Sequence, residues 1–439
     1  MRALDLIIKK RNGQSFSTEE INFMISEFNS GRMPDYQMSA LLMAVYFQGL
    51  NAKETTALTA ALANSGEVID FSSLGKIVTD KHSSGGVGDK TTLVLAPLVA
   101  AAGVSVAKIS GRGLGFTGGT IDKLESIPGF SAELSVERFM ELVQENDLAI
   151  MAQTERLTPA DRKLYALRDA TGTVENISLI AASIMSKKIA AGADTILLDV
   201  KTGKGAFMQS REEAFHLAET MFRIGKDMGR RIVSVVTDMN QPLGYAVGNA
   251  LEVKEAVETL KGQGPADVEK LCIILGGYLL GLAGKVRNPE AGQEELLRLL
   301  RNGAALQKFK EMVSLQGGNV ECLEDYSLLP QANYTETVTS TRAGFVQEID
   351  AGKVGRSAAL LGAGRAFKGD NIDPSVGIVL NHKVGETVCE GDVLAYLHSN
   401  DKDKFKAACR ELSNCFTLVD EKTEEFPPLV YGVVPPFPS

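Results

Sequence analysis

Residues 79–125 read TDKHSSGGVGDK, TTLVLAPLVAAAGVSVAKI and SGRGLGFTGGTIDKLE. The middle part, residues 91–109, is apolar, and two polar loops rich in glycine, hydroxyl groups and lysine flank it. Glycines let main-chain N–H groups approach an anion closely, and a helix N-terminus adds a favourable dipole. The stretch therefore predicts a strand, loop, helix, strand, loop unit in which both loops contribute to one phosphate site.

Other interpretations of the two loops are weaker. Glycine is the commonest turn residue, but two loops of the same chemistry around one short unit favour a ligand site over simple turns. The run GGVGDKTT lacks the glycine that precedes lysine in a P-loop, because Asp89 stands there. The glycines at 113, 115 and 118 fit GxGxxG, but a polar segment follows where a Rossmann helix would begin its apolar face.

Composition limits the class of protein. A chain of 439 residues with 44% hydrophobic residues can form two or three globular domains, and a net charge of −9 argues against nucleic acid or an anionic membrane as partner. The five cysteines form no CxxC pair, which predicts reduced thiols. We find no signal-peptide pattern and no apolar run of about 18 residues. These features predict a cytoplasmic protein.

Apolar patterns divide the chain into segments. Residues 1–66 show helix patterns only, with a capping box at residues 17–20 and a cap of the same spacing formed by Asn51 and Glu54. Residues 158–193 are helical again, and we expect them to pack on the first segment. Elsewhere helices alternate with apolar strands, which is typical of a parallel sheet. We predict an α/β protein with a discontinuous all-helical domain (1–66 and 158–193), a larger mixed α/β domain (67–157 and 194–333) and a β-rich C-terminal α+β domain (334–439).

A polar cluster marks the helical insertion. Ser183 and Lys187 are four residues apart and share one helix face, and Tyr165 and Arg168 precede them. Such a cluster suits a planar ligand with carbonyl oxygens and an N–H that gains negative charge during reaction. The alternative is a solvated helix face, since Lys188 is adjacent.

His82 lies in the first loop beside Lys81. A neighbouring ammonium lowers the pKa of an imidazole, so we expect a neutral hydrogen-bond donor or proton carrier near pH 7. A histidine without a role is the alternative. The sequence shows neither zinc-ligand spacing nor a GxSxG nucleophile motif.

Six motifs together resemble the thymidine/pyrimidine-nucleoside phosphorylase family over essentially the whole chain. They are KHSSGGVGDK (81–90), SGRGLGFTGGTIDKLES (110–126), LTPADRKLYALRD (157–169), ASIMSKK (182–188), DVKTGKGAFM (199–208) and QPLGYAVGNALEVKEA (241–256). The resemblance implies phosphorolysis of pyrimidine nucleosides such as uridine, thymidine and deoxyuridine. Inorganic phosphate would attack the anomeric carbon and release free base and (deoxy)ribose 1-phosphate. The resemblance also implies a homodimer, a cleft between two domains and no organic cofactor.

The resemblance assigns roles by position. A phosphate set comprises Lys81, Ser83, Thr92, Lys108, Ser110 and Thr120. A base set comprises Tyr165, Arg168, Ser183 and Lys187. The resemblance also implies three catalytic residues: Arg168 and Lys187 of the base set, and His82, which is directed at the base carbonyl.

Several positions bear on specificity and ion binding. Lys108 stands where thymidine-specific relatives tend to have Met, which implies that uridine is accepted too. A potassium ion is implied near four residues: Gly88, Leu243, Ala246 and Glu255. Lys90 replaces a Thr that helps hold this ion in some relatives, so its ammonium would compete with potassium. Phe116 replaces a common His.

Three alternatives remain open at this point. A thymidine-specific phosphorylase is the nearest. An anthranilate-type phosphoribosyltransferase shares the helical-plus-α/β architecture, but it would need acidic residues for a metal–diphosphate site. A nucleoside- or phosphate-binding protein without activity is the third.

Overall fold

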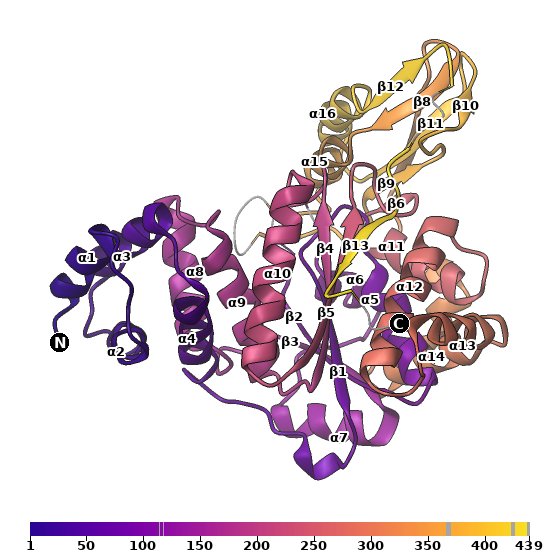
Figure 1. Ribbon diagram of the computed structural model, residues 1–439. Helices are drawn as coiled ribbons and strands as arrows, with labels where there is room; N and C mark the ends of the chain where they lie inside the picture. The colour runs from indigo at the N-terminus through magenta and orange to yellow at the C-terminus, as the bar shows by residue number, and fades with distance from the viewer. Residues whose placement is uncertain (114, 117, 366–369, 423–425, 437–439) are drawn as a thin grey trace.

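Three parts are visible in the computed structural model, which describes residues 1–113, 115–116, 118–365, 370–422 and 426–436. Figure 1 shows a central sheet, a helical domain to its left and a β-rich C-terminal part that projects at the top. This arrangement confirms the predicted α/β class with a helical domain and a β-rich C-terminal part.

The central sheet has the strand order β13-β5-β4-β1-β2-β3 in the described residues. All neighbouring strands are parallel except β13, which runs antiparallel to β5. Its strands are β1 (Val78–Ser83), β2 (Ser105–Ser110), β3 (Leu148–Ala152), β4 (Thr195–Thr202), β5 (Arg231–Asp238) and β13 (Val430–Val434). The inner strands are buried on both faces, as expected of a parallel sheet covered by helices.

Helices cover this sheet on both faces. Apolar side chains from α5, α11, α12, α13 and α14 form the largest core cluster with the sheet, and α10 packs on the other side with α9. Their bounds are α5 (Thr91–Ala101), α6 (Thr120–Leu124), α7 (Val136–Asn146), α10 (Arg211–Asp227), α11 (Asn249–Leu260), α12 (Ala266–Leu282), α13 (Pro289–Arg301) and α14 (Ala304–Leu315), with short 3-10 turns at Ser72–Leu74, Val320–Leu323 and Tyr326–Leu328.

The helical domain is built from two segments of the chain. Its helices are α1 (Ala3–Arg11), α2 (Thr18–Asn29), α3 (Asp35–Gln48), α4 (Ala52–Ala63), α8 (Pro159–Thr171) and α9 (Ile177–Ala190). The predicted capping boxes are present at the starts of α2 and α4. Leu164 and Leu179 of the second segment join the apolar core of the first, while Met185 and Ile189 pack into the α/β domain. Helix α9 therefore connects the two domains.

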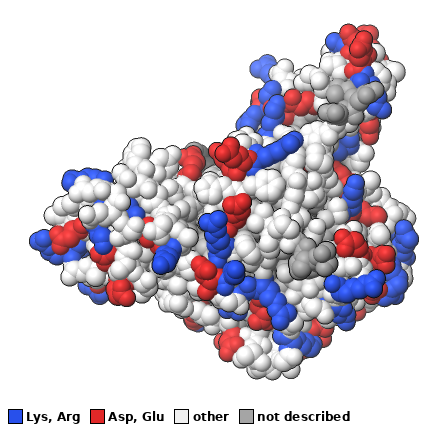
Figure 2. Space-filling view, in the orientation of Figure 1, with Lys and Arg blue, Asp and Glu red and all other residues white. Residues whose placement is uncertain are grey.

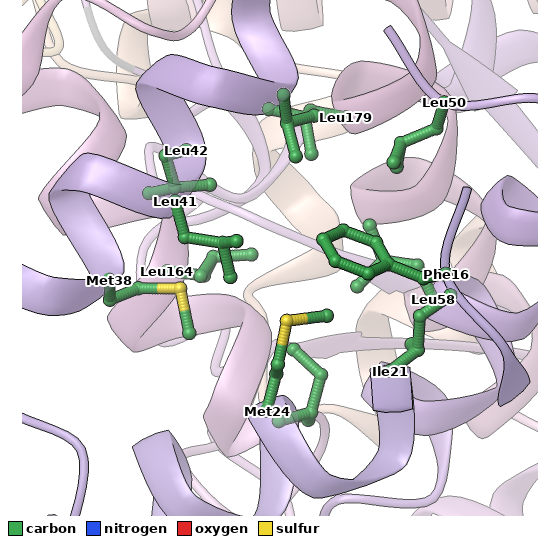
Figure 3. A pocket seen from close by; sticks show the side chains of 12 residues that line it. Phe16, Ile21, Met24, Met38, Leu41, Leu42, Leu50, Leu58, Leu164 and Leu179 are labelled. Atoms are coloured by element: carbon green, nitrogen blue, oxygen red, sulfur yellow. The ribbon is translucent and has the colours of Figure 1, made fainter. Parts of the chain in front are cut away.

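A small void of about 30 Å³ lies inside the helical domain. Figure 3 shows the side chains that line it, which come from α2, α3, α4, α8, α9 and the connections between them. Every lining residue is apolar, so a water there would lack hydrogen-bond partners. The void is a packing feature of this core.

The C-terminal part contains two small sheets. They have the orders β10-β8-β12 and β6-β9-β11-β7 among the described residues. Its elements are β7 (Tyr334–Thr339), β8 (Gly344–Ile349), α15 (Ala351–Leu361), β9 (Gly377–Leu380), β10 (Thr387–Val388), β11 (Val393–Ser399), α16 (Lys402–Leu412) and β12 (Phe416–Val419). Two strands tie it to the α/β domain. Strand β6 (Ala246–Val247) pairs with β9, and β13 returns to the central sheet.

The surface shows no concentration of basic side chains on the face in Figure 2, where acidic and basic groups alternate. Within the part of the chain that the structure describes, no helix is long and apolar enough to span a membrane.

Candidate active site

Strand β1 supplies charged groups to both faces of the central sheet. The structure places Lys81 and His82 in the last residues of this strand, whereas the sequence suggested a loop position. Side chains alternate along a strand, so Lys81 and Ser83 point to one face and Asp80 and His82 to the other. Since β1 lies between β2 and β4, the loops after β1 and β2 begin at the same edge of the sheet.

On one face, Lys81 is held by carboxylates and a hydroxyl. Its Nζ lies 3.3 Å from Asp199 Oδ2 and 3.9 Å from Asp89 Oδ1, and it donates a hydrogen bond to the Thr91 hydroxyl. Ser83 donates to the Asp89 carboxylate. Burial would raise the pKa of Asp89, but Lys201 and Lys81 outweigh it and hold that pKa well below its usual value. Asp89 is therefore ionised at the end of the first loop.

On the other face, Asp80 binds two ammonium groups. Its carboxylate lies 2.8 Å from Lys188 Nζ of α9 and 3.5 Å from Lys108 Nζ of β2. Both lysines also donate to the main-chain oxygen of Ile109. Burial lowers the pKa of Lys108 to about 7, because Asp80 offsets only part of the cost and Lys188 adds repulsion. Lys108 can therefore lose its proton near neutral pH.

The other members of the phosphate set lie at the ends of the two loops. Thr92 is in the first turn of α5, Ser110 is the last residue of β2, and Thr120 is the first residue of α6. The structure thus brings this set to the edge where β1 and β2 end.

The second loop is held by a residue from the C-terminal part. Arg365 makes a bidentate ion pair with Asp122, with nitrogen–oxygen distances of 2.8 and 2.7 Å, and donates to the Gly113 oxygen at 3.1 Å. The Gly113 N–H donates to the same carboxylate at 2.6 Å. Phe116 of this loop packs against Gly355 of α15. These contacts hold Gly113 and Phe116, two described residues of the loop, between the α/β domain and the C-terminal part.

In the base set, Ser183 and Lys187 are in direct contact. Lys187 Nζ donates to the Ser183 hydroxyl and to its main-chain oxygen, both at 2.8 Å, and forms an ion pair with Asp161 of α8. The Lys187 side chain is 30% exposed, so its ammonium can still meet a ligand.

Arg168 is almost fully buried. Its guanidinium donates to three main-chain oxygens, those of Thr173, Val174 and Leu179, at 3.2, 2.6 and 3.2 Å. Burial lowers its pKa, with Asp161 and Tyr165 acting in the opposite direction. The Tyr165 ring lies 5.9 Å from the guanidinium and is exposed. Arg168 therefore joins α8 to the start of α9, and these three hydrogen bonds use three of its five N–H donors.

His82 lies between the two sets. Burial is the main reason that its pKa lies well below the usual value, followed by repulsion from Lys188, Lys108, Lys81 and Lys187. These lysines belong to both the sheet edge and α9. The imidazole is therefore neutral at pH 7, as the sequence predicted.

The positions predicted for a cation also lie together. The ammonium of Lys90 donates hydrogen bonds to oxygens of Leu243, Ala246 and Glu255. The fourth position, Gly88, lies against Leu243.

Sequence reasoning missed the ion-pair partners. Their positions are Asp80, Asp161, Lys188, Asp199, Lys201, Asp122 and Arg365. Several stand inside the quoted motifs, but only the fold shows which charges meet.

Comparisons with known proteins identify the family of the chain. Three family models match: the helical bundle domain of a glycosyl transferase family at residues 4–66, its a/b domain at 75–306, and the pyrimidine nucleoside phosphorylase C-terminal domain at 345–419. The chain is 52% identical over 434 residues to the pyrimidine-nucleoside phosphorylase of Bacillus subtilis (strain 168), covering 99% of this chain and 100% of that protein. The chain belongs to the pyrimidine-nucleoside phosphorylase family. A protein of the same name from Staphylococcus aureus (strain USA300) is 51% identical over equal coverage.

A solved structure shares the fold. The anthranilate phosphoribosyltransferase of Thermus thermophilus matches with a TM-score of 0.57 at 20% identity, covering 71% of this chain and 99% of that one. At this identity the likeness concerns architecture alone. Members of the pyrimidine-nucleoside phosphorylase family are pentosyltransferases, and the chain is an enzyme of this kind.

Arg365→Met should weaken phosphate binding. The change removes the bidentate partner of Asp122 beside the second loop and leaves its carboxylate with one weaker ion pair, to Arg112 Nη1 at 3.7 Å. We expect the affinity for inorganic phosphate, measured by calorimetric titration, to fall by about tenfold or more. Arg342→Met removes an exposed ion pair with Asp420 and should leave the affinity unchanged. Equal affinity in wild type and Arg365→Met would refute a role for this ion pair.

Proposed function

We propose that the enzyme catalyses phosphorolysis of pyrimidine nucleosides, producing free base and (deoxy)ribose 1-phosphate. The full-length identity to proteins named pyrimidine-nucleoside phosphorylase carries this proposal. The buried lysine-rich edge of the central sheet and the polar cluster on α8 and α9 support it, because the reaction requires one anion and one planar base.

Phosphate would bind where the two loops begin. Lys81 and Lys108 supply cations, and the hydroxyls of Ser83, Thr92 and Ser110 supply donors. Few water molecules reach the buried ammonium groups, so their attraction for a dianion is strong. The Asp89 carboxylate accepts hydrogen bonds from the Ser83 and Thr91 hydroxyls, and phosphate would compete with it for these donors.

The base would lie against α8 and α9. Lys187 and Ser183 donate to its carbonyl and ring atoms, Arg168 adds N–H donors, and neutral His82 donates an N–H to the base carbonyl. A phosphate oxygen forms the bond to the anomeric carbon while the glycosidic C–N bond breaks. The bonding electron pair leaves with the base, whose negative charge these donors stabilise before a proton arrives from solvent. The enzyme forms no covalent intermediate in this scheme.

The proposed substrates include uridine, thymidine and deoxyuridine, because Lys108 occupies the position that bears on sugar and base range. The direct test is release of free base from uridine, thymidine and cytidine, with and without phosphate, by wild type and Lys108→Met. We expect phosphate-dependent release from uridine and thymidine, with uridine turnover reduced about tenfold or more in the variant.

Release from thymidine alone in the wild type would instead indicate a thymidine-specific enzyme. Release that needs no phosphate, or no release, would contradict phosphorolysis. Formation of a nucleotide from a base and 5-phosphoribosyl diphosphate would favour the phosphoribosyltransferase alternative.

The phosphate step should depend on the charge of Lys108. Its pKa of about 7 means that the ammonium is charged below that pH and neutral above it. We expect kcat/KM for phosphate to fall in the wild type between about pH 7 and about pH 9, relative to Lys108→Met. The titration of phosphate itself is common to both proteins, so their ratio isolates the lysine. A ratio that does not change with pH would contradict this assignment.

We also propose that the enzyme is a homodimer that joins through α1 and α3. These neighbouring helices carry exposed apolar side chains: Leu4, Ile8, Tyr36, Met43 and Phe47. Tyr36 and Phe47 are 74% and 76% exposed, although the Phe47 ring meets the neighbouring Tyr46 ring edge-to-face at 5.6 Å. Such exposure is unusual for large aromatic side chains. A cytoplasmic location is part of the same proposal, because the five cysteines are free thiols and the cytoplasm is a reducing compartment.

Sedimentation equilibrium should give twice the 47.0 kDa mass of one chain. Phe47→Asp should shift the protein toward monomer, because a charge would be buried in the interface. Leu315→Asp changes an exposed apolar residue elsewhere and should leave the dimer intact. A monomeric wild type would contradict the proposal.

A further inference from the structure

The ammonium of Lys90 has no contact with solvent. Lys90 immediately precedes α5, and its Nζ donates to the main-chain oxygens of Leu243 at 2.8 Å and Ala246 at 3.0 Å and to the Glu255 carboxylate. An ammonium has three donors and no acceptor. Two carbonyls and one carboxylate therefore use all of them.

The main chain closes tightly around this group because two glycines lack side chains. A Cβ on Gly88 would lie 2.6 Å from the Leu243 oxygen, and a Cβ on Gly244 would lie 2.9 Å from Lys90 Nζ. The Glu255 carboxylate is fixed in turn, since Oε1 accepts from two main-chain N–H groups of the same turn at 2.9 and 3.1 Å. The oxygens are therefore held in place for a cation.

A second lysine binds other carbonyls of this turn. Lys383 Nζ donates to the oxygens of Pro242 at 2.5 Å and Gly244 at 2.9 Å and pairs with Asp267 at 3.0 Å. Residues 242–246 thus wrap around two ammonium groups. Each ammonium has one carboxylate to balance its charge.

These residues fit an ammonium and leave no place for a potassium ion. The family resemblance assigned potassium to Gly88, Leu243, Ala246 and Glu255. Lys90 Nζ binds oxygens of the last three, and the Lys90 main-chain N–H donates to the Gly88 oxygen at 2.9 Å. A potassium ion among them would place two positive charges within a few ångströms of each other beside one carboxylate.

The Lys90 ammonium is charged at neutral pH. Burial disfavours the charge, but Glu255 and Glu252 outweigh it, and the pKa of Lys90 lies above its usual value.

We propose that Lys90 is a built-in replacement for a bound monovalent cation, and that the protein needs no such ion for stability or activity. The ammonium ties the first glycine-rich loop to the turn at 242–246 and to Glu255 of α11. Because β6 begins at Ala246 and pairs with β9, the same contact reaches the C-terminal part. This inference concerns the folded protein and does not depend on the proposed reaction.

The test compares thermal unfolding in potassium, sodium and choline chloride at equal ionic strength for wild type, Lys90→Thr and Lys90→Met. Thr shortens the side chain and adds an oxygen, so an ion can enter. Met fills the space without a charge. We expect the wild-type midpoint to agree within about 1 °C in all three salts. Lys90→Thr should be less stable in choline and regain at least about 2 °C in potassium, whereas Lys90→Met should regain nothing.

Glu255→Gln in the Lys90→Thr background should abolish the gain, because the ion loses its only carboxylate. A wild-type midpoint that rises specifically with potassium would overturn the proposal, as would Lys90→Thr without a potassium-specific gain. Comparing the wild-type unfolding midpoints in the three salts tests the proposal even if a variant fails to fold.

Discussion

Charged side chains are buried at the carboxyl edge of the central sheet, and their pairing determines the rest of the site. Six charged side chains are almost completely buried there: Lys81, Lys108, Lys188, Lys201, Asp80 and Asp199. An isolated buried charge is very unfavourable, so these groups must stay close to their partners. Lys201 Nζ lies 2.9 Å from Asp199 Oδ2, yet in the described residues it has no aligned hydrogen bond. With Asp89 included, four lysines face three carboxylates, so the network keeps donors that a bound anion can use.

This constraint explains the position of the helical domain. Lys188 belongs to α9, and its ion pair with Asp80 holds the end of that helix against β1. The other end of α9 packs in the helical core, and Lys187 and Ser183 lie between. Helix α9 thus carries Ser183 and Lys187 of the base set and reaches the phosphate edge, whereas Tyr165 and Arg168 belong to α8. Holding both reactants in this way can supply several kcal/mol of the barrier reduction, about 7–11 kcal/mol at most for well-oriented reactants.

Local signals predicted much of this structure. The capping boxes at Ser17 and Asn51 start α2 and α4, and the four-residue spacing of Ser183 and Lys187 produces a direct hydrogen bond. The glycine-rich loops follow β1 and β2 as expected. What sequence reasoning missed depends on contacts between distant residues. Arg365 and Asp122 are 243 positions apart, and the return of β13 to the central sheet follows from tertiary packing that short-range periodicity does not encode.

The central claim is that phosphate itself attacks the anomeric carbon at the lysine-lined edge of the sheet. Phosphorus NMR of uridine, inorganic phosphate and the wild-type enzyme tests this most directly, because it observes the phosphate through the reaction. We expect the inorganic phosphate signal to fall as a ribose 1-phosphate signal grows, and we expect added uracil and ribose 1-phosphate to regenerate uridine. Free base that accumulates while the phosphate signal stays constant would show hydrolysis and contradict the account.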